Sequence, residues 1–215
     1  VNKINDAKLD IKDIIKDPIE IINQYSEIPN PQIPLPSEIY LPQRKNAKGY
    51  DIENEVTRLS MINIFNTIDQ NLTAVSIIKG IETTDKVQVV YNPANLGQQL
   101  GQVAFASDDT IKESLEVASS FFPKWNNLEI EKKVQVINKF AELLENNTEK
   151  LLKICVLEAG KTIRDSIDDL REAVDFCFYY SSEAMRLFSG PTILKGPTGE
   201  KNKLFYEGKG VIFAI

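Results

Sequence analysis

The stretch Gly208-Lys-Gly-Val-Ile-Phe-Ala-Ile215 decides the fold class of this chain. Its two glycines predict a turn, and every residue of the following run, Val211–Ile215, is apolar. An apolar run without polar alternation is typical of a strand buried on both faces of a parallel sheet. Such a strand needs neighbouring strands and covering helices, so we predict an α/β fold. Left uncovered it would be an edge open to pairing, so we expect further chain or a partner to cover it.

The segment before that strand, between residues 107 and 190, has the spacing of amphipathic helices. Apolar residues recur every three or four positions, first between residues 130 and 144 and then between residues 167 and 188. The expected boundaries are the N-cap Ser107, the stop Pro123, the break Asn146-Asn147, the cap Thr148, the C-terminal Gly160 and the terminator Gly190-Pro191. We expect these helices to form a layer against the sheet.

The residues before 107 are less regular. Pro18 fits the first turn of a short helix, and five prolines between residues 29 and 42 exclude helix and favour an extended arm. Residues 52–68 are expected to be partly helical. The β-branched run Lys86–Tyr91 predicts a strand, and a second, short strand is expected around Val103.

Charge and residue usage exclude several classes of protein. The chain has no histidine, which removes Ser-His and Cys-His nucleophile systems and zinc sites built on imidazole. A formal net charge of −6 argues against nucleic acid as the main partner. Cys155 and Cys177 form neither a disulfide framework nor a metal-ligand spacing, and no apolar run is long enough to span a bilayer. We therefore expect a cytoplasmic protein with no metal site and no membrane span.

Three stretches, taken in their order, carry a family resemblance. They are Leu157-Glu-Ala-Gly-Lys161, Glu172-Ala-Val-Asp-Phe-Cys-Phe-Tyr-Tyr180 and Gly196-Pro-Thr-Gly-Glu-Lys-Asn202. Together they resemble the aldehyde dehydrogenase superfamily, and are most similar to the L-glutamate γ-semialdehyde (Δ1-pyrroline-5-carboxylate) dehydrogenase module of PutA-type enzymes of proline catabolism. Ile33-Pro-Leu-Pro-Ser-Glu-Ile-Tyr40 and Arg44-Lys-Asn-Ala-Lys-Gly49 also resemble the PutA segment between the proline dehydrogenase barrel and this module.

The resemblance implies how the chain is organised. Residues 1–45 would be a linker arm that follows a proline dehydrogenase domain. Residues 46–215 would be the N-terminal part of the NAD-binding domain, truncated after the first strand of its Rossmann-like sheet. NAD would be the cofactor, with FAD only if a proline dehydrogenase domain is attached, and the cofactor site would begin at Ile215. Residues 192–208 resemble the protruding strands through which aldehyde dehydrogenases oligomerise, so a homo-oligomer is expected.

Glu172 is the candidate substrate-binding residue. In the related semialdehyde dehydrogenases the matching glutamate reaches the amino end of the substrate, where an acidic side chain suits an ammonium group. A surface or structural salt bridge is the alternative for Glu172. Cys155 and Cys177 lie on apolar helix stripes and are interpreted as core residues, and Arg171 and Asp175 as solvated or structural residues.

No catalytic residue is expected in this chain. The family's cysteine nucleophile and general-base glutamate come after the position of residue 215, so these 215 residues are predicted to be inactive. We expect a piece of a bifunctional bacterial enzyme whose module oxidises L-glutamate γ-semialdehyde, a small-molecule substrate, to glutamate with NAD. Two alternatives stay open: a catalytically dead product of a split gene, and a helical interaction protein that shares ancestry. A polar, capped C-terminus would favour the last, and Phe213-Ala-Ile215 is the opposite.

Overall fold

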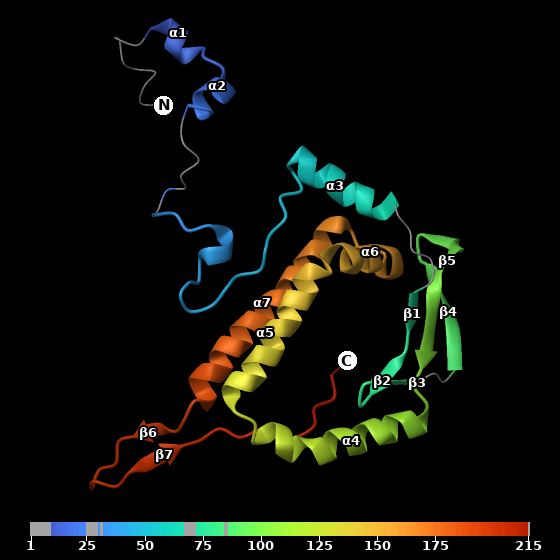
Figure 1. Cartoon of the computed structure of the whole chain (residues 1–215), viewed down its shortest axis with the longest axis vertical. Coiled ribbons are helices and arrows are strands. Elements are labelled where there is room, and N and C mark those ends of the chain that lie inside the picture. Colours follow the sequence, from blue (N-terminus) through green and yellow to red (C-terminus); the bar gives the residue numbers. More distant parts are fainter. Residues whose placement is uncertain (1–9, 25–29, 31, 67–71, 84–85, 215) are drawn as a thin grey trace. The chain divides into compact units, whose positions relative to one another are not determined.

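The structure is a computed structural model that describes residues 10–24, 30, 32–66, 72–83 and 86–214. The chain divides into two compact units, residues 1–35 and residues 36–215. The first unit contains two short helices, α1 (Ile11–Ile14) and α2 (Pro18–Ile22) (Figure 1). Pro18 opens α2 directly after its N-cap Asp17, as predicted. Proline suits this position because its missing N–H would have had no partner inside the helix.

The second unit contains the four helices expected between residues 107 and 190. They are α4 (Asp108–Asn126), α5 (Ile130–Asn146), α6 (Thr148–Ala159) and α7 (Ile163–Phe188). Helices α5 and α7 lie side by side (Figure 1), and their apolar stripes meet in a core that includes Ala141, Val174 and Phe178. The predicted amphipathic periodicity is therefore confirmed by burial.

Four predicted helix boundaries are confirmed and two are wrong. Helix α5 ends at Asn146, and α7 ends at Phe188, just before Gly190-Pro191. Ser107 caps α4, since its side chain accepts a hydrogen bond from the Thr110 N–H, and Gly160 ends α6 in a left-handed conformation with φ +67°. Pro123 does not stop α4, which continues to Asn126. It lies in the last turn, where a proline removes a single hydrogen bond. Thr148 is the first residue of α6 rather than its cap, because its hydroxyl donates back to the carbonyl oxygen of Glu145.

The segment before the sheet is partly helical, as predicted. Helix α3 (Glu55–Asn66) lies within the range expected to be helical, and its Met61 shares a second core with Leu152 of α6 and Ile167 of α7. The proline-rich arm, expected to be extended, contains a single turn of 3-10 helix, η1 (Pro36–Glu38). This turn is short enough to accommodate Pro36 at its first position.

A mixed sheet has the strand order β1-β5-β4. Strand β4 (Lys86–Asn92) confirms the predicted strand and pairs antiparallel with β5 (Asn95–Phe105), while β1 (Leu72–Ala74) pairs parallel with β5. Strand β5 is longer than the short strand predicted around Val103, because pairing with β4 extends it back to Asn95, while β1 pairs with residues 101–103. A Cβ atom at that glycine would lie 2.0 Å from the carbonyl oxygen of Leu72, so only glycine allows β1 to approach.

Two small hairpins complete the described strands. Strands β2 (Ser76–Ile78) and β3 (Ile81–Thr83) form an antiparallel pair that sequence patterning did not predict. Strands β6 (Thr192–Leu194) and β7 (Asn202–Leu204) form a second antiparallel pair after α7 (Figure 1), and every residue of both strands is exposed. The second hairpin falls within the 192–208 range expected to form protruding strands.

The predicted strand at Val211–Ile215 is not formed. Residues 211–214 belong to no strand and are exposed, and Ile215 lies outside the described residues. A parallel strand is stabilised by hydrogen bonds to neighbouring strands. Within the described chain no strand pairs with these residues, so their apolar sequence is not sufficient to order them.

Candidate functional site

Glu172 lies on an exposed face of α7, as a substrate-binding residue would require. Within the described residues its carboxylate makes no hydrogen bond or ion pair, so the predicted alternative of a salt bridge finds no partner there. Phe176 and Tyr180 follow Glu172 at successive helical turns and are exposed, with ring centroids 5.8 Å apart. A free carboxylate beside aromatic rings offers charge and π-face contacts that suit a small ammonium group.

The carboxylates around Glu172 are already paired. Asp169 forms an ion pair with Lys161, and Asp168 lies 3.9 Å from Arg171. Asp175 accepts a hydrogen bond from the Ala47 N–H at 2.8 Å, which confirms its predicted structural role. On this stretch of α7, Glu172 is therefore the carboxylate that is left available for a ligand among the described residues.

Arg171 is half-buried, and its Nε atom is buried without a described hydrogen-bond partner. Its predicted role as a solvated or structural residue is consistent with this position, because the side chain packs beside Gly49. The weak ion pair with Asp168 is mostly exposed to solvent, so it adds little to stability.

Neither cysteine has the environment of a nucleophile. Burial raises the pKa of the Cys177 thiol, and burial together with the nearby Asp169 carboxylate raises the pKa of the Cys155 thiol. Both side chains are half-buried, and Cys177 packs against the α5–α7 core. A raised pKa lowers the fraction of reactive thiolate. The predicted core position is confirmed for Cys177, while Cys155 is half-buried outside both core clusters.

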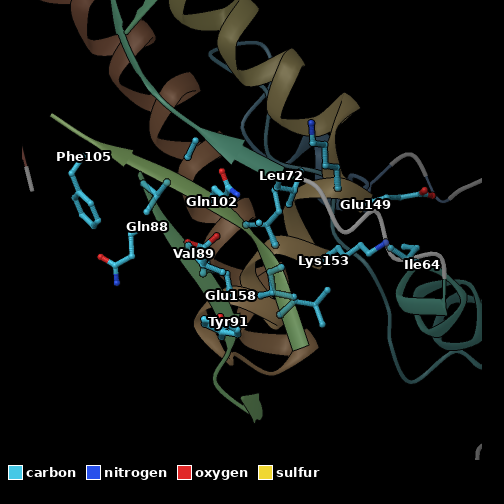
Figure 2. Close-up of a pocket in the computed structure, with 18 residues that line it drawn as sticks. Ile64, Leu72, Gln88, Val89, Tyr91, Gln102, Phe105, Glu149, Lys153 and Glu158 are labelled. Carbon is cyan, nitrogen blue, oxygen red and sulfur yellow. The ribbon is translucent and has the colours of Figure 1, made fainter. Parts of the chain in front are cut away.

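A cavity of about 890 Å³ lies between α6 and the sheet (Figure 2). It was not predicted, because its walls come from segments far apart in the sequence. The lining is mostly aliphatic, and the charged residues Glu149, Lys150, Lys153 and Glu158 balance one another. The described lining residues include no serine, threonine or cysteine, so the cavity can accept an apolar group and offers no nucleophile of those three types.

The described residues do not fit a dinucleotide. Such a site needs the carboxyl end of a strand, a glycine-rich turn and the N-terminus of a helix. Residues 211–214 form no strand, and Ile215, where the cofactor site was predicted to begin, is outside the described residues. Helix α4 does follow β5, but Asp108 and Asp109 in its first turn would repel a phosphate.

The part of the chain that the structure describes contains neither a metal-binding cluster nor a membrane-spanning helix. No group of three or more His, Cys, Asp or Glu side chains is placed to hold a metal ion there. None of the helices in the described ranges has the length and apolar character needed to cross a membrane.

Comparisons with known proteins point to one family. The model of the aldehyde dehydrogenase family matches residues 81–215. The bifunctional protein PutA of Escherichia coli is 29% identical over 199 residues, which cover 89% of this chain and 15% of PutA. The 1-pyrroline-5-carboxylate dehydrogenase 1 of Halalkalibacterium halodurans is 33% identical over 141 residues, which cover 65% of this chain and 27% of that enzyme.

A solved structure shares the fold. The 1-pyrroline-5-carboxylate dehydrogenase from Thermus with bound NAD has a TM-score of 0.68 and 23% identity, over 75% of this chain and 32% of that one. The chain therefore spans about a third or less of the proteins that it matches.

Proposed function

Because the chain belongs to the aldehyde dehydrogenase family, we propose that it is part of an enzyme of proline catabolism that oxidises L-glutamate γ-semialdehyde to glutamate with NAD. The observation that carries the proposal is that the relatives include both PutA and 1-pyrroline-5-carboxylate dehydrogenases. The NAD bound to the Thermus enzyme supports the choice of cofactor. A bacterial cytoplasmic location and a homo-oligomer formed through residues 192–208 belong to the same proposal, as does FAD if a proline dehydrogenase domain precedes these residues.

Within this function, Glu172 would bind and orient the substrate. Its exposed carboxylate would accept hydrogen bonds from the α-ammonium group, and Phe176 would present its ring face to the same group. This contact distinguishes an amino-acid aldehyde from a plain aliphatic aldehyde. The residue binds and supplies no chemistry, since it is not placed beside either thiol.

The test compares the full native polypeptide with the same polypeptide carrying a single substitution. Glu172→Gln keeps the shape of the side chain and removes its charge. We expect kcat/KM for L-glutamate γ-semialdehyde to fall roughly ten- to a hundredfold, as for a charge-assisted hydrogen bond, with kcat/KM for propanal unchanged. Asp168→Asn, an exposed carboxylate one turn away, is the matched control and should leave both values unchanged.

The same assay separates the alternatives. If Glu172→Gln lowers kcat/KM equally for both aldehydes, Glu172 does not recognise the ammonium group, although the proposed enzyme class stands. If the native polypeptide oxidises neither aldehyde, the dead split-gene product or the helical interaction protein replaces the proposed enzyme. The 215 residues purified alone should reduce no NAD, because both thiols have a raised pKa and the chain has no histidine to activate them.

A further inference from the structure

Residues 36–50, here called the strap, are tied to both α5 and α7. Ala47 is 2% exposed and packs with Ala141 of α5 and with Val174 and Phe178 of α7. The Ala47 N–H donates to Asp175 Oδ1 at 2.8 Å, and the Lys48 N–H donates to Glu145 Oε1 at 3.2 Å. The strap therefore buries one small side chain in the core and uses a carboxylate from each helix to hold its backbone.

Arg44 adds a second attachment at the same carboxylate. Its Nη1 atom lies 3.6 Å from Asp175 Oδ1, and the two side chains are 16% and 30% exposed. The guanidinium carbon is 3.8 Å from the ring centroid of Tyr40 and 5.8 Å from that of Tyr179. An ion pair shielded in this way is less screened than one in open solvent. In the pair of Arg186 and Glu183, further along α7, the arginine is 62% exposed, whereas Arg44 is 16% exposed.

Asp175 thus makes two kinds of contact with the strap. It accepts a main-chain hydrogen bond from the strap, and it pairs with the arginine that stacks on the strap's own tyrosine. Neither contact stabilises α7 internally, because both partners lie more than a hundred positions earlier in the sequence. Asp175 is also one turn from Glu172, on the neighbouring side of the helix.

We propose that Asp175 is a positioning residue whose carboxylate latches the strap onto α7, with Arg44 as the partner that keeps the latch closed. All of these contacts lie within the chain, so this proposal does not rest on the proposed enzyme activity. The strap covers the α5–α7 core at Ala47 and places Arg44 between the rings of Tyr40 and Tyr179. Loss of the carboxylate's charge weakens the attachment of the strap while the helices remain folded.

Limited trypsin digestion of the whole chain tests the latch, because Lys45 and Lys48 flank the buried Ala47. Asp175→Asn keeps an acceptor for the Ala47 N–H but removes the charge that strengthens this bond and pairs with Arg44, and it should speed cleavage after both lysines about tenfold. Arg44→Gln keeps the acceptor for Ala47 and should speed cleavage less. Glu183→Gln, which breaks an ion pair on the same helix that does not involve the strap, should leave cleavage unchanged.

Cleavage after Lys139, an exposed residue of α5, reports on the helices in the same digest. The expected result is faster strap cleavage with an unchanged rate at Lys139. Unchanged strap cleavage in both Asp175→Asn and Arg44→Gln would overturn the latch. So would equal acceleration at Lys139, because Asp175 would then support the whole helical layer and not the strap.

Discussion

At the scale of single residues, the environment of a side chain separates binding groups from core groups. The apolar stripe around Cys155 already favours a core role for it, whereas the sequence leaves Glu172 between a substrate contact and a salt bridge. The thiol is half-buried and has a raised pKa, whereas the carboxylate is exposed and has no described partner. The Cys155 thiol is therefore less reactive than a free thiol, and the Glu172 carboxylate is available for a ligand.

Alkylation of the thiols tests this at the same scale. Both cysteines of the native chain should react with iodoacetamide at pH 8 several-fold more slowly than in the chain unfolded in urea, because burial raises the pKa of each thiol. The difference in rate should shrink as the pH rises through the native pKa, where the thiolate forms in both states. Mass spectrometry after timed quenching measures each site, and equal native and unfolded rates at pH 8 would contradict the prediction.

At the scale of elements, close backbone approach decides which strands pair. Strand β1 contributes three residues to the sheet, and it reaches β5 because Gly101 has no side chain. Polar and apolar alternation along β5 contains no sign of this neighbour. The pairing is therefore set by a contact between segments separated by the whole of β2, β3 and β4.

Gly101→Ala tests the strand pairing. The added Cβ would overlap the Leu72 carbonyl oxygen, so β1 must move away, and we expect a loss of about 1–3 kcal/mol in the free energy of unfolding by urea. Gly97→Ala in the same strand is the matched control, because its Cβ would meet Asn95 Oδ1 at an ordinary 3.5 Å. Equal losses in the two variants would show that the close approach of β1 contributes nothing.

At the scale of the whole molecule, order is concentrated where helices bury each other. Helices α5 and α7 enclose side chains such as Val174, which is 1% exposed, while the β6–β7 hairpin has no buried residue. Local opening costs little free energy where few apolar contacts must be broken. The hairpin should therefore open far more often than the helical pair.

Hydrogen exchange followed by mass spectrometry measures this difference. In a dilute solution of the chain, amides of β6 and β7 should exchange within the shortest labelling times, and those around Val174 should be the slowest. Protection of the hairpin that grows with protein concentration would instead indicate a second copy covering it, as the proposed homo-oligomer requires. Fast exchange around Val174 would contradict the burial of the α5–α7 core.

Sequence alone determined the helices and the family. The spacing of apolar residues along α5 and α7, the cap at Ser107 and the glycine at Gly160 follow local rules of hydrogen bonding and side-chain direction. The order of short motifs supported the resemblance, which the match over residues 81–215 confirmed. Glu172 was selected from that resemblance, and the structure adds that it is exposed.

Only the tertiary structure decided how distant segments meet. The latch between Ala47, Arg44 and Asp175, and the cavity between α6 and the sheet, join residues that have no local signal for one another. The failure of residues 211–214 to form a strand has the same origin. A helix completes its hydrogen bonds within its own segment, but a strand, a strap or a cavity is stable only when separate segments supply the partners.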